Sequence, residues 1–303
     1  MPLILEGIWI PIVTPFRDDA IDHAALAALA RHLAASGITG FVAGATTGEG
    51  ALLSIDEQAA VLHTLRHATP NLPVVLGVSS PSTAMAAHQA KTLSALRPDG
   101  LLVTPPSYVR PTQLGVQKHF EAVADAAPHT PIIVYSIPYR TGVTVEVETL
   151  QTLAQQCCVV GIKECGGDLT RMLRLIHETS LQVLSGDDGM NFSALCLGAH
   201  GTIAASAHIL PHWHVRMHEL LRQGALARAR RIAVALHPIT QLLFAEPNPS
   251  PLKALLAESG HIASDVRLPF VPVSDALRGR LVAALAALEN AEEVMMERVM
   301  GPS

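Results

Sequence analysis

The chain has 303 residues, of which 49% are hydrophobic and 16% charged, and its formal net charge is -5 at pH 7. This composition is typical of a globular protein with a large buried core. The negative charge and the scattered Lys and Arg residues exclude a basic footprint for nucleic acid. No run approaches the roughly 18 apolar residues of a membrane span and no secretory leader is recognisable, so we expect a cytoplasmic protein without a membrane partner.

Short apolar runs alternate along the chain with Ala/Leu-rich segments of helical composition. The runs predict strands at residues 8–13, 41–45, 73–78, 100–104, 131–135, 159–163, 181–185 and 201–205. The segments between them predict helices at residues 22–36, 55–68, 83–96, 113–126, 146–156 and 170–178. This alternation is typical of a parallel sheet covered by helices. Eight such strands match an α/β (β/α)8 TIM barrel of about 250 residues better than an open doubly wound sheet.

Beyond the eighth strand the pattern changes, because no strand signal returns after residue 211. Helical segments at residues 212–222, 225–245, 249–259 and 274–298 follow one another, separated by Gly and Pro. We therefore expect the barrel to occupy residues 1–225 and a C-terminal helical region to occupy residues 226–303, packed on the barrel.

Lys163 ends an apolar run, Val-Val-Gly-Ile-Lys-Glu, that predicts a buried strand. Burying an unpaired ammonium costs several kcal/mol, roughly, so such a position is unusual. An amine in an apolar site has a lowered pKa and can attack a carbonyl to form a Schiff base. The alternative is a strand-end lysine whose stem packs on the protein while its charge reaches solvent.

In a barrel of this type the active site forms where the strands end. Thr46 and Thr47 follow the second predicted strand, and their hydroxyls could hold a small carboxylate or simply form a polar turn. Tyr135 ends the fifth strand, next to that of Lys163, and could transfer protons or fill the core. Arg140 follows it in a Pro-containing turn, where it could clamp a second carboxylate or face solvent.

Other chemistries have weaker support in the sequence. Asp187 and Asp188 have no His or Glu at ligand spacing, so helix capping is the better interpretation. His63 and His67 lie four apart on a predicted helix, a pair expected by chance among 15 histidines. No GxGxxG, P-loop or HExxH pattern occurs, so no metal site is predicted. The four cysteines include no CxxC pair and are interpreted as reduced and structural.

Four linked motifs resemble those of the class I pyruvate-dependent aldolase superfamily, which includes the N-acetylneuraminate lyases, and most closely its dihydrodipicolinate synthase family. The motifs are Gly44-Ala45-Thr46-Thr47-Gly48-Glu49, Tyr135-x-x-Pro138-x-Arg140-Thr141-Gly142, Gly161-Ile162-Lys163-Glu164 and Leu184-Ser185-Gly186-Asp187-Asp188. The similarity runs from about Gly7 to at least Pro272 and includes Glu246-Pro247-Asn248-Pro249 and Leu268-Pro269.

The resemblance implies a role for each matching residue. Lys163 would form the Schiff base with pyruvate, Tyr135 would transfer protons, and Thr46 would belong to the same proton relay. The substrate-binding residues implied are Thr47 at the pyruvate carboxylate, Ile203 through its backbone, Gly186 and Arg140. Tyr108 would reach across a dimer interface into the relay of a neighbouring subunit, which implies a homo-oligomer, typically a homotetramer made of two tight dimers.

Arg140 also bears on the second substrate, because N-acetylneuraminate lyases lack an arginine in that turn. The resemblance therefore implies condensation of pyruvate with L-aspartate-4-semialdehyde in diaminopimelate and lysine biosynthesis, with no metal or organic cofactor. Two alternatives stay open. One is a paralogue with the same imine chemistry on a 2-keto-3-deoxy sugar acid or related keto acid, and the other is a non-catalytic homologue that binds a keto acid.

The sequence departs from the family pattern at three places. Only Tyr108 remains of a usual pair of tyrosines, with an extra residue before it, and Ser136 replaces a frequent asparagine. Members inhibited by L-lysine carry polar residues after the Thr-Thr-Gly-Glu motif and after the third strand. The matching positions here are Ile55, Gln58, Pro81 and Met85. We therefore predict weak or absent inhibition by L-lysine.

Overall fold

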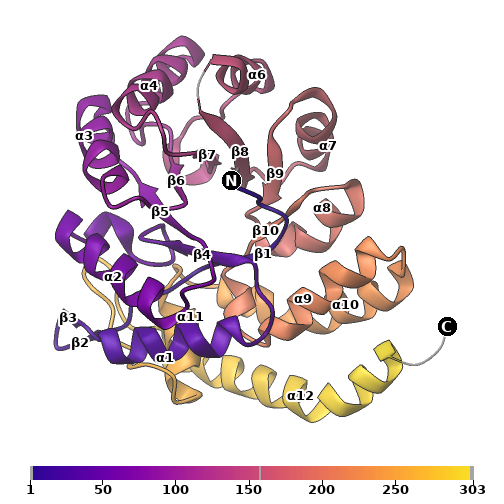
Figure 1. Cartoon of the computed structure of the whole chain (residues 1–303). Coiled ribbons are helices and arrows are strands. Elements are labelled where there is room, and N and C mark those ends of the chain that lie inside the picture. The colour runs from indigo at the N-terminus through magenta and orange to yellow at the C-terminus, as the bar shows by residue number, and fades with distance from the viewer. Residues whose placement is uncertain (1–2, 157, 301–303) are drawn as a thin grey trace.

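The computed structural model describes residues 3–156 and 158–300, so Cys157 and the last three residues of the predicted C-terminal region lie outside the described residues. Eight parallel strands form a closed barrel in the order β1-β10-β9-β8-β7-β6-β5-β4. The strands are β1 (Gly7–Pro11), β4 (Gly40–Ala43), β5 (Val74–Val78), β6 (Gly100–Val103), β7 (Ile132–Ser136), β8 (Val159–Glu164), β9 (Gln182–Ser185) and β10 (Gly201–Ile203). The predicted TIM barrel is confirmed (Figure 1).

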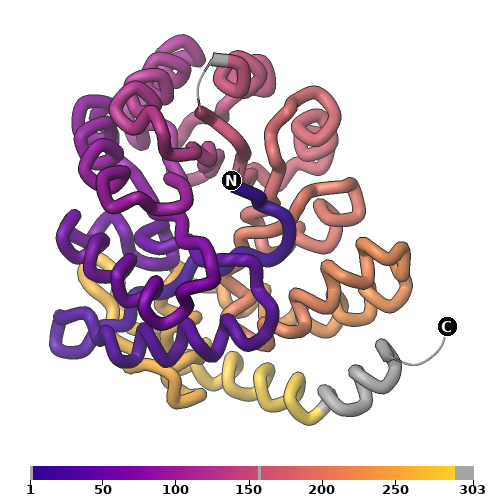
Figure 2. The backbone as a smooth tube through the Cα atoms, in the orientation of Figure 1, coloured from indigo at the N-terminus to yellow at the C-terminus, as the bar shows by residue number. Residues whose placement is uncertain are grey.

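Helices follow the strands and cover the outside of the barrel (Figures 1 and 2). They are α1 (His23–Ala34), α2 (Ile55–Ala68), α3 (Thr83–Ser94), α4 (Gln113–Ala126), α5 (Pro138–Thr141), α6 (Val147–Gln156), α7 (Leu169–Glu178) and α8 (Asn191–Leu197). Polar residues fix several of the helix starts. Ser54, for example, accepts a hydrogen bond from the Glu57 backbone N–H while the Glu57 carboxylate accepts one from Ser54.

The chain after β10 is helical, as expected, with α9 (Pro211–Arg222) before the predicted C-terminal region and α10 (Leu226–Leu243), α11 (Ser250–Glu258) and α12 (Asp275–Met300) within it. Helix α10 packs against both α9 and α12 (Figure 1). The predicted domain boundary between residues 225 and 226 falls at the start of α10, and the division itself stays a prediction. No described helix is both long and apolar enough to cross a membrane.

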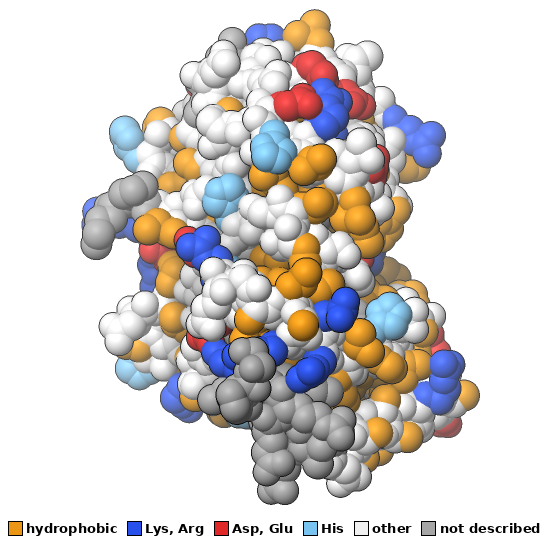
Figure 3. Space-filling model, turned by 90° about the vertical axis from the view of Figure 1, so that its right-hand side faces the viewer, with side chains coloured by type: hydrophobic (Ala, Val, Ile, Leu, Met, Phe, Trp, Pro, Cys, Tyr) orange, Lys and Arg blue, Asp and Glu red, His pale blue; other side chains and the backbone are white. Residues whose placement is uncertain are grey.

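Two hydrophobic clusters separate the inside of the barrel from its helical coat. The inner cluster includes Trp9, Val42, Ile133 and Leu184, all of which are completely buried. A larger cluster joins the outer faces of the strands to the helices. On the face shown in Figure 3, hydrophobic side chains are interspersed with charges of both signs. The inward-facing residues thus fill the barrel, so chemistry is confined to its ends.

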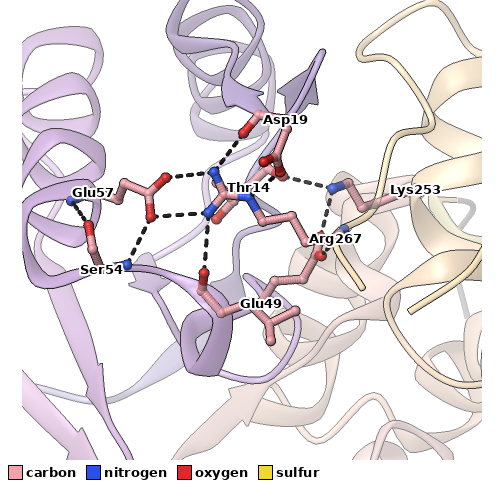
Figure 4. Close-up of polar contacts among 8 residues, drawn as sticks. Thr14, Asp19, Glu49, Ser54, Glu57, Lys253 and Arg267 are labelled. Atoms are coloured by element: carbon pink, nitrogen blue, oxygen red, sulfur yellow. Dashed lines mark hydrogen bonds and ion pairs between the residues drawn. The ribbon is translucent and has the colours of Figure 1, made fainter. Parts of the chain in front are cut away.

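A buried ion pair fastens the C-terminal region to the barrel. Lys253 of α11 places its Nζ 2.7 Å from Glu49 Oε1, and both side chains are completely buried. The same amine donates to the Thr14 carbonyl at 2.9 Å (Figure 4) and lies 4.4 Å from the centre of the Phe16 ring. Removing one partner of such a pair leaves the other charge desolvated and uncompensated.

The substitution Lys253→Met is therefore expected to lower the free energy of unfolding by about 3–5 kcal/mol. The loss arises because the Glu49 carboxylate stays buried without its counter-charge. The double variant Lys253→Met/Glu49→Gln should recover most of the loss, since it buries no charge. Urea denaturation measures both, with Lys118→Met, in an exposed ion pair with Glu121, as a control that changes little. A single variant as stable as the parent would contradict the assignment.

Candidate active site

The barrel brings the predicted strand-end residues together at one mouth. Tyr135 on β7 and Lys163 on β8 are direct neighbours in the parallel pairing, and Lys163 pairs on its other side with Leu184 of β9. Gly186 follows β9, and Ile203 ends β10 in a buried position. The prediction that Lys163 and Tyr135 lie side by side is confirmed.

Lys163 is buried, with 4% of its surface exposed, and its Nζ lies 4.2 Å from the centre of the Tyr135 ring. This burial argues against a charge that reaches solvent, and no carboxylate lies within ion-pair distance of the amine among the described residues, so a structural salt bridge is unsupported too. Gly186 makes room for it, because a Cβ there would lie 2.5 Å from both Lys163 Cε and Cys165 Sγ. The substrate-binding role predicted for Gly186 stays a prediction.

The direction of the Lys163 pKa corrects the sequence-based expectation. Burial lowers this pKa, as expected, but Tyr135, Cys165 and Asp188 together outweigh burial and raise the pKa of Lys163 above its usual value. Burial in turn raises the pKa of Tyr135, and raises that of Cys165 to about 12, so both are protonated at neutral pH. An amine must be neutral to attack a carbonyl, so a neighbouring group has to take up the proton of Lys163 before the reaction begins.

Thr46 links Tyr135 to the loop after β4. The Thr46 Oγ1 lies 3.4 Å from the Tyr135 hydroxyl, a long hydrogen bond that either atom could donate. Thr47 is buried and accepts a hydrogen bond of 3.0 Å from Asn248 Nδ2 in the C-terminal region. The loop turns tightly, since a Cβ on Gly50 would lie 1.7 Å from the Gly44 carbonyl oxygen. Tyr135 thus contacts the Thr46 hydroxyl through its own hydroxyl and the Lys163 amine through its ring, and the proton relay itself stays a prediction.

A cavity of about 310 Å³ opens beside this chain. Of the predicted site residues, Thr46, Tyr135 and Arg140 line it, whereas Lys163 does not. Arg140 is exposed, and its guanidinium carbon lies 5.4 Å from the centre of the neighbouring Tyr139 ring. A larger cavity, of about 500 Å³ between the barrel and the C-terminal helices, includes none of the predicted site residues.

Tyr108 is not brought to the site within this chain. Its side chain is 91% exposed, and only its neighbour Ser107 lines the cavity. The backbone of Tyr108 adopts a positive φ of 70°, which is uncommon for a residue other than glycine. Its predicted role across a subunit interface stays a prediction.

The two aspartates after β9 have structural partners. Asp187 caps the 3₁₀ turn at Asp188–Met190 by accepting a hydrogen bond from the Gly189 N–H, which confirms the capping interpretation. Asp188 Oδ1 accepts a hydrogen bond of 2.6 Å from the Ser206 N–H, and burial raises the pKa of the Asp188 carboxyl. Among the residues that the structure describes, no group of three His, Cys, Asp or Glu side chains could hold a metal ion.

Several site residues escaped the sequence analysis. Asn248 holds Thr47, Lys253 holds Glu49, and Phe270 lines the cavity, yet all three come from the C-terminal region. Lys253 could have been recognised as a buried lysine, because it interrupts the apolar run Pro-Leu-Lys-Ala-Leu-Leu much as Lys163 ends an apolar strand. Phe270 could not have been recognised, since an aromatic residue in a loop has no distinguishing pattern.

Comparison with known proteins places this site in a family. The dihydrodipicolinate synthetase family matches residues 4–288. A 4-hydroxy-tetrahydrodipicolinate synthase of Clostridium acetobutylicum is 36% identical over 281 residues, covering 91% of this chain and 98% of the relative. The solved structure of the corresponding synthase from Methylacidiphilum fumariolicum has a TM-score of 0.93 and 31% identity, over 97% of this chain and 99% of the other.

A solved monomeric dihydrodipicolinate synthase variant has a TM-score of 0.92 and 30% identity, covering 94% of this chain and 97% of its own. The similarity thus spans the barrel and most of the C-terminal helices. It includes the segments that carry Thr46, Tyr135 and Lys163, whose geometry suits an imine-forming enzyme. The chain therefore belongs to the dihydrodipicolinate synthetase family and is a class I aldolase-type lyase.

Proposed function

We propose that this enzyme is a 4-hydroxy-tetrahydrodipicolinate synthase, which condenses pyruvate with L-aspartate-4-semialdehyde in lysine and diaminopimelate biosynthesis. The observation that carries the proposal is the buried amine of Lys163, 4.2 Å from the Tyr135 ring at the mouth of the barrel. A buried amine next to a phenol and a hydroxyl is suited to Schiff-base chemistry and has no evident structural partner of opposite charge among the described residues.

The reaction proceeds through a covalent enamine. The Lys163 amine attacks the keto carbon of pyruvate, and loss of one water gives the imine. A proton leaves the methyl group, and its electron pair moves toward the imine nitrogen to form the enamine. The enamine carbon then bonds to the aldehyde carbon, whose oxygen takes up a proton. Finally the amino group of the second substrate attacks the imine carbon, closes the ring and releases the Lys163 amine.

Tyr135 and Thr46 supply the proton transfers of this sequence. Since the pKa of Lys163 is raised, its proton must leave before attack, and the buried Tyr135 hydroxyl with its Thr46 contact offers a route. The hydroxyl of Thr47 can donate to the pyruvate carboxylate while it accepts from Asn248, so that its orientation is fixed beforehand. The backbone at Ile203 completes the proposed pyruvate site.

Borohydride reduction in the presence of pyruvate tests the proposal directly. The chain contains only four lysines, at positions 91, 118, 163 and 253, so peptide mass analysis separates the candidates readily. We expect a pyruvate adduct on Lys163. If no adduct forms, or if it forms on an exposed lysine instead, the imine mechanism is wrong for this protein.

Arg140 is expected to determine the affinity for the second substrate. The Arg140→Ala variant should raise the KM for L-aspartate-4-semialdehyde by about 10- to 100-fold, because a charge-assisted hydrogen bond to its carboxylate is lost. Formation of the pyruvate adduct should be unchanged. Steady-state kinetics measure the effect, with Arg280→Ala on the exposed face of α12 as the control. A variant that kept full activity on the semialdehyde, or a parent that preferred 2-keto-3-deoxy sugar acids, would favour a paralogous function.

L-lysine is expected not to inhibit the enzyme at sub-millimolar concentration. Ile55, Pro81 and Met85 offer no side-chain group that could bind an ammonium or a carboxylate. Gln58 is buried, donates to the Gly77 carbonyl and accepts from Gln89 Nε2, so its amide is already engaged. Initial rates measured at increasing L-lysine concentrations test this prediction, and a sub-millimolar inhibition constant would contradict it.

The proposed assembly is a homotetramer of two tight dimers. Tyr108 is 91% exposed, and its neighbour Val109 is 58% exposed, close in sequence to a residue that lines the cavity. Apolar side chains so exposed near an active site are suited to contact a second subunit. In such a dimer Tyr108 would approach the proton relay of the partner.

A further inference from the structure

The outer part of the active-site cavity is built by the C-terminal region as well as by the barrel. Pro269 and Phe270 line the cavity together with Glu49 and Leu52 from the loop after β4. Phe270 is partly buried, although no strand or helix carries it. The position of this aromatic ring therefore depends on the contacts that fix the segment from Arg267 to Phe270.

Arg267 holds that segment through five polar contacts of its side chain and one of its backbone. Its guanidinium pairs with both Glu57 oxygens at 2.6 and 3.0 Å, and its Nε lies 2.9 Å from Asp19 Oδ1. It also donates to the Leu52 and Asp19 carbonyls (Figure 4). Its backbone N–H donates to Glu49 Oε2 at 3.0 Å. A bidentate pair of this kind fixes direction as well as distance.

Glu49 is the point where this segment meets the catalytic loop. One of its oxygens binds Lys253 at 2.7 Å and the other accepts from the Arg267 backbone, so the carboxylate is held from two sides of the C-terminal region. Glu49 lies three residues after Thr46, whose hydroxyl contacts Tyr135. One buried carboxylate, that of Glu49, therefore connects the loop that carries Thr46 to the segment that carries Phe270.

We propose that Phe270 is a specificity-determining residue for the second substrate and that Arg267 is its positioning residue. This inference rests on the proposed function. Tyr135, whose ring lies against the Lys163 amine, lines the cavity together with Phe270 and Arg140. The cavity is thus the space through which the aldehyde meets the enamine. Phe270 fills part of it and admits a short aldehyde with a polar tail, while it excludes aldehydes that carry a ring.

The experiment measures selectivity in the full-length enzyme. The ratio of kcat/KM for phenylacetaldehyde to that for L-aspartate-4-semialdehyde is determined from pyruvate consumption. In the Phe270→Ala variant this ratio should rise by about tenfold or more, because the probe's ring occupies the volume that the Phe270 ring vacates. The Arg267→Met variant should shift the ratio in the same direction, and Arg267→Lys should shift it less. Arg278→Met, which removes an ion pair with Glu258 in the same region, is the matched control and should leave the ratio unchanged.

Borohydride trapping of the pyruvate adduct accompanies each assay and separates the two proposals. An adduct on Lys163 in every variant, with a raised ratio in Phe270→Ala, supports the inference. A normal adduct with a ratio that changes by less than about twofold overturns it while the proposed function stands. If the parent enzyme itself forms no adduct, the proposed function has failed. Phe270→Ala keeps the test decisive even if loss of the Arg267 contacts prevents folding.

Discussion

Replacing Lys163 by methionine is expected to abolish the pyruvate adduct and to lower kcat/KM by about 10⁴-fold or more, since the nucleophile itself is lost. Methionine has a similar length and no charge, so it can occupy the space beside Gly186 without burying an ammonium. The fold should therefore be retained. Steady-state kinetics and mass analysis after borohydride reduction measure the two losses, and circular dichroism checks that the variant is folded.

Lys118→Met is the matched control, because it removes an amine that lies in solvent next to Glu121. It should leave the adduct and kcat/KM unchanged. A residual activity of Lys163→Met within about tenfold of the parent would mean that the imine is not on the reaction path. An adduct that still formed in Lys163→Met would have to lie on another lysine, which would contradict the assignment of Lys163 as the nucleophile.

The barrel and the inner part of the site were predictable from the sequence because both depend on short-range order. The alternation of apolar runs and helical segments gave the strand order, and neighbouring strands in a parallel barrel must place Tyr135 beside Lys163. Thr46 follows from the same reasoning, since its strand ends at the same mouth. The motifs that resemble the family lie at these strand ends, which is why residues from separate motifs, such as Thr46 and Tyr135, come into contact there.

The outer part of the site could not be predicted, because it depends on contacts between distant segments. Arg267 meets Glu57 at a separation of 210 residues and Asp19 at a separation of 248. No local pattern reveals such a pairing. The short helix α8 was also missed, since its seven residues span about two helical turns, too few to show a clear helical period. The direction of the Lys163 pKa shift differs from the expected one because it depends on which side chains surround the amine after packing.

Two of the four lysines, Lys163 and Lys253, are buried, and their neighbours differ in charge. Lys253 has a carboxylate partner, Glu49, and the pair serves as an anchor. Lys163 has a phenol as its nearest partner, which can exchange a proton but does not fix the ammonium by a full opposite charge. Burial alone therefore does not separate a structural lysine from a reactive one. The chemical nature of the neighbour does.

Acidification from pH 7 to pH 5 is expected to destabilise the protein by about 2 kcal/mol for each of three buried histidines. Burial lowers the pKa of His119, His208 and His214 to about 4, from an ordinary value of 6.5. The unfolded chain therefore binds more protons than the folded protein between about pH 6.5 and pH 4, and stability falls as the pH falls through that window. Urea denaturation at several pH values measures the slope.

Other groups modify this slope without reversing it at pH 5 to 7. Burial raises the pKa of Glu164 and Asp188 above their ordinary values of 4.5 and 3.8. Protonation of these carboxyls therefore favours the folded state. Above pH 5 these two carboxyls bind few protons in the unfolded chain. Each proton that they bind in the folded protein offsets part of the loss of stability caused by the histidines. The summed loss of about 6 kcal/mol from three histidines is comparable with the whole stability of many domains.

Replacing one of the histidines tests the assignment. In the folded protein His208 accepts a hydrogen bond from the Val13 N–H through Nε2 and donates to the Ala205 carbonyl through Nδ1, a pattern that requires the neutral ring. A glutamine amide offers the same acceptor and donor but does not titrate. His208→Gln should therefore reduce the loss between pH 7 and pH 5 by about 2 kcal/mol. His63→Gln, on the exposed face of α2, should leave the slope unchanged. Equal slopes in the His208 variant and the parent would show that the buried ring is not what makes the protein sensitive to acid.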